Sequence, residues 1–146
     1  MPADDVTYRV RGGFTDAELT ELHGRAFGDG DRRADGIVIP WNNRLALSIA
    51  WVTARQGGEL LGFVNVIGDG GAHAVLLDTC VAPQAQGRGV GKRLVHEAAD
   101  EARRLGCTWL HADYEPHLVR FYEQACGMRP THAGLLRLTG SGAQAQ

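Results

Sequence analysis

The sequence has few cysteines and no cysteine pattern that would build a covalent or metal-bound scaffold. Its three cysteines, Cys80, Cys107 and Cys126, are odd in number, widely spaced and free of any CxxC pair. The six histidines are scattered along the chain as well. These absences argue against a disulfide framework and a metal site, and they predict the reduced thiols that are usual in the cytoplasm.

The chain also lacks the features of proteins that enter membranes or bind nucleic acids. No apolar run approaches the roughly 20 residues that cross a bilayer. The first ten residues, MPADDVTYRV, contain neither a basic nor an apolar signal region. The formal net charge is −2 and charges of both signs are interspersed, so the basic stripe of a DNA- or RNA-binding face is missing. We expect a cytoplasmic protein with no nucleic-acid or membrane partner.

The size and composition are those of one folded domain. The chain has 146 residues, of which 44% are hydrophobic and 22% charged, and this is enough for a hydrophobic core. We expect a single domain over residues 1–146, with a core of about 8–139 and a flexible tail at 140–146.

The most informative segment is a glycine-rich loop between an apolar run and a helical pattern. The apolar run 74–81 stops before Pro83, and Gly87, Gly89 and Gly91 then alternate with other residues. Glycine lets backbone N–H groups approach a ligand closely, and the first turn of a helix leaves N–H donors unpaired. Because the helix dipole also favours an anion there, the segment predicts a diphosphate-binding loop.

The spacing of this loop excludes two common phosphate-binding motifs. A P-loop aligned on Gly91 needs glycine at 86 and serine or threonine at 93, where the chain has glutamine and arginine. A dinucleotide fingerprint that begins at Gly87 needs glycine at 92, where the chain has lysine. The pattern that is present is Q-x-x-G-x-G, formed by Gln86, Gly89 and Gly91. It resembles the acetyl-CoA motif of the GCN5-related N-acetyltransferases.

The expected order of helices and strands resembles the same family over roughly residues 8–139. A capping box at Thr15 and Glu18 starts a first helix, and Gly57-Gly58 predicts a hairpin. Strands are expected at 8–12, 45–56, 59–67, 73–81, 109–114 and 135–139, and further helices at 89–105 and 116–127. The resemblance implies an α/β (α+β) fold with a mixed, mostly antiparallel sheet of six to seven strands and about four flanking helices. Two of its strands splay apart to form the acetyl-CoA cleft.

The resemblance also implies which residues bind acetyl-CoA, the expected co-substrate. The backbones of Cys80 and Val81 would pair with the pantetheine arm as though it were an added strand, since a free strand edge offers N–H and C=O groups. At least one of Arg88, Lys92 and Arg93 is expected on a phosphate. The loop residues assigned to the cofactor are Gln86, Gly87, Arg88, Gly89, Val90, Gly91 and Lys92.

Two residues are the catalytic candidates. Tyr122 stands in an F-Y-E segment where, by resemblance, a tyrosine protonates the departing CoA thiolate, and a phenol suits that task. The alternative for Tyr122 is a core tyrosine beside Phe121. Asp78 interrupts an apolar run, where a carboxylate is costly without a partner or a cavity. It is the candidate for steering and deprotonating the amine, and the alternative is a carboxylate bonded to a neighbouring loop.

Other residues are candidates for the acceptor site. His111 and Asp113 are rival bases to Asp78, and Trp41 and Asn43 stand where family members often place acceptor residues. Acceptor specificity is expected in the polar segment 28–43. One position departs from the family pattern: many members have asparagine about seven residues before the tyrosine, where this chain has Glu115.

The sequence therefore predicts an acyltransferase. It would move an acetyl group from acetyl-CoA to the primary amine of a small molecule or peptide by direct attack in a ternary complex. The alternative is a non-catalytic acyl-CoA-binding or regulatory domain of the same fold. The sequence leaves open the acceptor, the general base and whether the protein forms a homodimer.

Overall fold

The computed structural model describes residues 5–28 and 36–140, and within them one five-stranded sheet organises the chain. The strands lie side by side in sequence order, and β5 pairs parallel to β4 while all other pairs are antiparallel. The sheet is thus mixed and mostly antiparallel, as the sequence predicts. Its members are β1 (Thr7–Val10), β2 (Ala50–Gln56), β3 (Glu59–Gly68), β4 (His73–Val81) and β5 (Trp109–His111).

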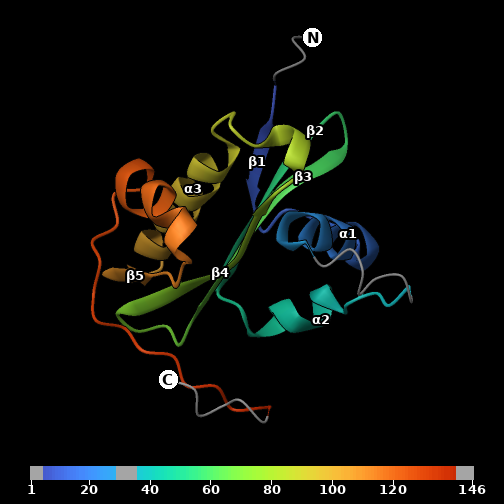
Figure 1. Cartoon of the computed structure of the whole chain (residues 1–146). Coiled ribbons are helices and arrows are strands. Elements are labelled where there is room, and N and C mark those ends of the chain that lie inside the picture. Colours follow the sequence, from blue (N-terminus) through green and yellow to red (C-terminus); the bar gives the residue numbers. More distant parts are fainter. Residues whose placement is uncertain (1–4, 29–35, 141–146) are drawn as a thin grey trace.

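Helices cover both faces of this sheet (Figure 1). α1 (Asp16–Phe27) and the short α2 (Trp41–Arg44) lie on one face, and α3 (Val90–Arg104) lies on the other with the turns that follow β5. The central strands are therefore buried on both sides, which explains their almost continuous apolar sequence. Val52, Phe63, Val64 and Val66 are completely buried there.

Two local predictions are confirmed. The Thr15 hydroxyl accepts from the Glu18 backbone N–H, and the Glu18 carboxylate accepts from the Thr15 N–H, which completes the capping box of α1. Gly57 and Gly58 both adopt positive φ, 56° and 86°, between β2 and β3. Two consecutive left-handed residues are the geometry of a two-residue hairpin turn that matches the twist of its strands.

The strand expected from residue 45 begins only at Ala50. Residues before it form α2 and a 3₁₀ turn, Leu45–Leu47. Trp41 and Leu45 are four residues apart and both are buried. This spacing places both side chains on one face of a helical turn, so the segment is helical and not a strand. Hydrophobic periodicity alone cannot tell whether a run as short as 45–49 is a strand or a buried helical turn.

The expected count of six to seven strands is wrong for the described residues, which form five. The segment 135–139 is not a strand, and its leucines Leu135, Leu136 and Leu138 are 80% or more exposed. β5 is only three residues long, so the edge it offers is too short to hold a longer strand by ladder hydrogen bonds. Apolar residues without such a partner do not form a strand by themselves.

The helix expected at 116–127 is present as two short helical turns of different kinds. A 3₁₀ turn, Pro116–Leu118, leads into a π turn, Arg120–Ala125. The Cys126 N–H donates to the Phe121 carbonyl at 2.9 Å, and the Met128 N–H donates to that of Tyr122 at 2.9 Å. Such wide π turns are frequent at functional sites, and this one carries Tyr122.

Part of two predictions lies outside the described residues. The polar segment 28–43, expected to hold acceptor specificity, includes 29–35, and the tail 140–146 includes 141–146. Within the described residues, no helix has the length and apolar character needed to span a membrane.

Candidate active site

A bulge in β4 lies at the centre of the site. Phe63 pairs with Cys80 but Asn65 pairs with Leu77, so two residues of β4, Asp78 and Thr79, face one residue of β3. Asp78 has φ of 57°, one of two left-handed non-glycine residues among those described. Bulges re-aim side chains, and strained backbone of this kind gathers at functional positions.

The edge of β4 is open beyond the bulge. β5 pairs with β4 only along His73–Val75, and then leaves it. The two strands therefore splay at the place where the sequence predicts a cofactor cleft. Gln86 Nε2 donates to the Val81 carbonyl at 3.2 Å, so this carbonyl already has a protein partner. Cys80 is buried, and burial raises the pKa of its thiol, which makes it a poor nucleophile.

The glycine loop has the geometry of an anion-binding loop. Gly87 and Gly89 have φ of 77° and 83°, and no atom lies within 4 Å of where a Cβ would be. Gly89 is the N-cap of α3 and no side chain caps that end, so the backbone N–H donors of the first turn remain available to a ligand. The residues present thus fit the diphosphate of a CoA molecule.

The basic residues around this loop differ in their contacts. Arg93 donates to Glu97 at 2.7 Å and lies over the ring of Tyr8, with its guanidinium carbon 4.8 Å from the ring centroid. It is thus held on the flank of α3 by neighbours on α3 and β1. Arg88, Lys92 and Arg93, the three candidates for a phosphate contact, are all exposed.

Tyr122 faces the bulge from the other side of the cleft. Its ring is buried, and its phenol is hydrogen-bonded to the side chain of Thr79. Burial raises the pKa of Tyr122, and the Thr79 hydrogen bond opposes this only partly. The phenol therefore keeps its proton through neutral pH, as a proton donor must.

A second tyrosine stacks on the first. The ring centroids of Tyr114 and Tyr122 are 4.8 Å apart and the planes are inclined by 18°. The Tyr114 hydroxyl donates to Glu123 at 2.9 Å, and this hydrogen bond raises the Tyr114 pKa. Tyr114 thus holds the Tyr122 ring in place, with its own hydroxyl engaged with Glu123.

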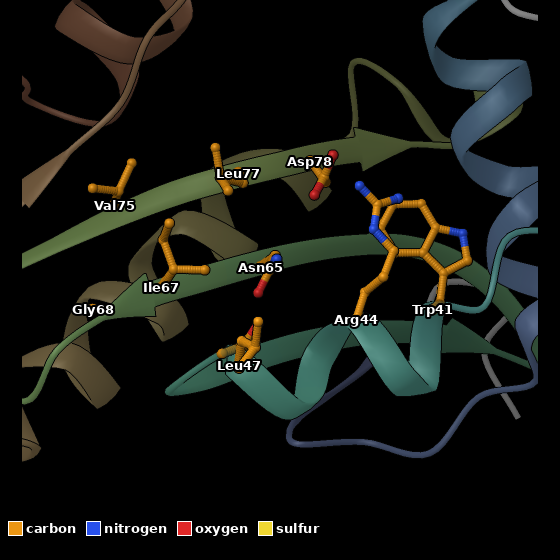
Figure 2. A pocket seen from close by; sticks show the side chains of 10 residues that line it. Trp41, Arg44, Leu47, Asn65, Ile67, Gly68, Val75, Leu77 and Asp78 are labelled. Atoms are coloured by element: carbon orange, nitrogen blue, oxygen red, sulfur yellow. The ribbon is translucent and has the colours of Figure 1, made fainter.

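A pocket of about 450 Å³ opens between α2 and the strands β3 and β4. Figure 2 shows Asp78 at one end of it and Arg44 rising from α2 toward β4. His23 Nε2 lies 3.2 Å from Asp78 Oδ1, so the carboxylate is linked to α1. The pocket is lined by Trp41, Arg44, Leu47, Ser48, Asn65, Ile67, Gly68, Val75, Leu77 and Asp78.

The structure brings together only some of the predicted acceptor residues. Trp41 and Asp78 line the pocket, but Asn43 is exposed on α2 and is not part of its lining. His111 lies near the far end of β4, where its Nε2 is 2.7 Å from Nδ1 of His73, and Asp113 is exposed in the loop after β5. The Glu115 backbone caps the 3₁₀ turn, but its side chain makes no capping hydrogen bond.

Sequence reasoning missed the three other polar residues of this pocket and the partner of its carboxylate. Arg44, Ser48 and Asn65 line the pocket, and His23 bonds Asp78. Asn65 gave a readable signal, since it interrupts the apolar run of β3 just as Asp78 interrupts β4. His23 and Arg44 gave none, because their position depends on how α1 and α2 pack on the sheet. Among the described residues, no cluster of three His, Cys, Asp or Glu is placed to hold a metal ion.

Comparison with known proteins gives one matching family. The model of the acetyltransferase (GNAT) family matches residues 17–128. A mycothiol acetyltransferase of Nocardia farcinica is 34% identical over 86 residues, which cover 55% of this chain and 28% of that protein. A chloroplastic serotonin N-acetyltransferase of Oryza sativa is 29% identical over 77 residues, covering 51% of this chain and 38% of that protein. The chain therefore spans less than half the length of these curated relatives.

Solved structures share the fold. An acetyltransferase of Trypanosoma brucei superposes with a TM-score of 0.72 at 23% identity, covering 92% of this chain and 99% of that chain. An aminoglycoside N-acetyltransferase solved in complex with CoA gives a TM-score of 0.68 at 20% identity, covering 92% and 95%. At this identity the likeness shows the architecture alone.

Proposed function

Because the chain belongs to the GNAT family of acetyltransferases, we propose that it is an acetyl-CoA-dependent N-acetyltransferase whose acceptor is a primary amine. The observation that carries the proposal is the bulge in β4. Its two residues serve two sites, since Asp78 lines the pocket and Thr79 contacts the buried phenol of Tyr122. The proposed base and the residue that contacts the proposed acid are therefore neighbours in β4.

Acetyl-CoA, when bound, supplies an acetyl group activated as a thioester. The chain's contribution to its binding is the uncapped N-terminus of α3 with Gly87 and Gly89 before it, which offers N–H donors to the diphosphate. The open edge of β4 offers backbone groups to the pantetheine arm. Holding both reactants in one cleft lowers the entropic part of the barrier.

Proton movement is assigned to two side chains. Asp78, linked to His23, accepts a proton from the acceptor ammonium so that its nitrogen can attack the carbonyl directly. Tyr122 donates its phenolic proton to the departing thiolate. Its raised pKa keeps that proton available.

The test of the proposal is ligand-dependent stability. Acetyl-CoA at 100 times its Kd should stabilise the protein by about 2.7 kcal/mol, whereas ATP with magnesium or NAD should not. Gly89→Ala should lose most of this stabilisation, because a side chain at positive φ distorts the loop at a cost of roughly 1–2 kcal/mol. The measurement is a thermal melt with each ligand, followed by a thiol-release assay with a panel of amines.

Gly106→Ala is the matched control. Gly106 follows the other end of α3, also has positive φ (97°), and also has open space around its missing Cβ. It should lose similar stability yet keep the full acetyl-CoA effect. Stabilisation by ATP with magnesium and not by acetyl-CoA would refute the proposal. Binding of acetyl-CoA with no thiol release from any amine would favour a non-catalytic acyl-CoA-binding domain instead.

A further inference from the structure

The proposed acceptor pocket contains a cation that has no ionic partner among the described residues. Arg44 lines it, and its guanidinium carbon lies 4.7 Å from the centroid of the Trp41 ring. Trp41 is 1% exposed, so this ring is a fixed platform for the guanidinium. Arg44 makes no ion pair with any described residue. Its fork of N–H donors therefore remains available for a carboxylate from outside the protein.

The same pocket carries one carboxylate. Asp78 lines it from β4, and the view in Figure 2 shows Arg44 pointing from α2 toward Asp78. The two do not form an ion pair, since the one ionic partner of Asp78 among described residues is His23. The pocket thus presents separate positive and negative groups from two elements, and the walls beside them are aliphatic: Leu47, Ile67, Val75 and Leu77.

Three buried polar atoms of the lining residues have no hydrogen-bond partner among the described residues. Asn65 is 7% exposed and its Oδ1 has no hydrogen bond, and neither Ser48 Oγ nor Trp41 Nε1 has one. Figure 2 shows the Asn65 side chain directed into the space between β3 and α2. Leaving a buried acceptor unpaired costs about 1–3 kcal/mol, and a ligand N–H or O–H removes this cost. The pocket therefore fits a ligand with donors beside its apolar part.

These groups distinguish between classes of amine. A polyamine or aminoglycoside would place extra cations near Arg44, and a peptide N-terminus would leave Arg44 without an anion. A phosphate-bearing amine would call for more than one cationic or N–H group, and Arg44 is the one basic residue of the lining. A small amine with one carboxylate and an apolar side chain matches the pocket: its carboxylate suits Arg44, its amino group suits Asp78, and its side chain suits the aliphatic wall.

We propose that the acceptor of the acetyltransferase reaction is a free apolar amino acid, with its carboxylate on Arg44 and its amino group at Asp78. This rests on the function proposed above. In the reaction a C–N bond forms to the acetyl carbon and the C–S bond of the thioester breaks. Of the two protons that the ammonium loses, one leaves through Asp78 and His23 to water. The other restores Tyr122 after its proton has passed to sulfur.

The experiment compares matched acceptors that differ in the carboxylate alone. Leucine, methionine and phenylalanine are each assayed against their amides by thiol release. The wild type should prefer at least one acid over its amide by about 10- to 100-fold in kcat/KM, the range for one charge-assisted pair. Arg44→Gln should abolish this preference, Arg44→Lys should keep part of it, and Arg103→Gln should keep all of it. Arg103 is an exposed arginine on α3, paired with Asp100.

A binding measurement gives a readout independent of turnover. Calorimetric titration of the preferred amino acid without acetyl-CoA should show binding to wild type and Arg103→Gln and weakened binding to Arg44→Gln. Arg44→Glu should shift preference toward the diamine cadaverine. The inference is overturned if amides are used as well as acids, or if Arg44→Gln leaves the acid-to-amide ratio unchanged. If acetyl-CoA binds and other amines release thiol while no amino acid does, the inference fails and the proposed function stands. If acetyl-CoA does not bind, the proposed function itself fails.

Discussion

At the scale of single residues, the candidate site contains three groups with a conformation or environment that is unusual in a well-packed protein. Asp78 keeps a left-handed backbone that is unfavourable for a residue with a side chain. Asn65 keeps a buried oxygen with no partner. Tyr122 keeps its hydroxyl on Thr79, at the open edge of β4. The first two of these features cost stability, and all three lie where the proposed reaction needs them.

Tyr122→Phe tests the role of the phenol. The ring remains stacked on Tyr114, so stability should fall by no more than about 1 kcal/mol for the lost hydrogen bond to Thr79. Acetyl-CoA affinity should hold, while kcat falls on the order of 10²–10⁴-fold, the range for a positioned general acid. One thermal melt and one thiol-release assay measure both.

Tyr114→Phe is the matched control for this variant. It also removes one hydroxyl, from the ring that stacks 4.8 Å from Tyr122, but that hydroxyl bonds Glu123. Its kcat should stay close to the wild-type value. If Tyr122→Phe turns over within a factor of two of wild type, Tyr122 is a packing residue and the acid lies elsewhere.

Asp78→Asn tests the carboxylate. The amide has the same shape and can still bond His23, which lies 3.2 Å from Asp78 Oδ1, so the fold should persist. Loss of the charge should lower kcat/KM for the amine by about 10²–10⁴-fold, without changing acetyl-CoA binding. Initial rates between about pH 6 and 9 check this. Kinetics equal to wild type across that range would remove Asp78 from the mechanism and direct attention to His111 and Asp113.

At the scale of elements, α3 contacts the glycine loop, the π turn that carries Tyr122, and the region of β1. A Cβ on Gly91 would lie 3.1 Å from the ring of Phe121, so any side chain at this position would push against the ring next to Tyr122. Toward its other end, Glu101 is buried and accepts from Arg11, which follows β1, and from Arg104. The hydrogen bonds from Arg104, followed by those from Arg11, hold the pKa of Glu101 at about 2.

The pKa of Glu101 predicts how stability depends on pH. A carboxyl with a lowered folded-state pKa contributes stability above its ordinary value of about 4.5, and this contribution is lost as pH falls toward 2. Glu101→Gln should therefore be less stable than wild type by about 1–3 kcal/mol near neutral pH, after allowance for solvent screening of its partners. The difference should shrink to nearly zero by about pH 2.

Urea unfolding at a series of pH values measures this effect. Asp100→Asn is the control, because Asp100 and Arg103 form an exposed pair one turn away and the variant should match wild type throughout. A Glu101→Gln deficit that stays constant from neutral pH to pH 2 would mean that the loss is one of packing and not of charge.

At the scale of the whole molecule, the features predicted from sequence are those set by nearby residues. The α1 capping box, the Gly57-Gly58 hairpin and the glycine loop before α3 need only the chemistry of a few adjacent positions. The start of β2 and the number of strands were wrong, because tertiary partners decide them. Trp41 and Leu45 pack into the core, and this packing favours helical turns over a strand. Residues 135–139 have no strand edge that is long enough to pair with.

The candidate site divides in the same way. The Q-x-x-G-x-G pattern and the lone carboxylate at Asp78 can be recognised in the sequence. His23 and Arg44 reach the pocket from α1 and α2, and nothing in their neighbouring sequence shows it. Long-range packing of the helices on the sheet, which local patterns do not encode, completes the acceptor side.

Because the bulge adds one residue to β4, odd-numbered residues point to opposite faces of the sheet before and after it. Before it, Val75 and Leu77 line the pocket; after it, Val81 lies on the opposite side, 3.5 Å from where a Cβ on Gly91 would be. Odd-numbered residues thus line the pocket in one half of β4 and face the glycine loop in the other. Deleting or inserting a single residue here would move every following side chain of β4 to the opposite face of the sheet. For the proposed reaction, the length of this strand is consequently as strict a requirement as the identity of its side chains.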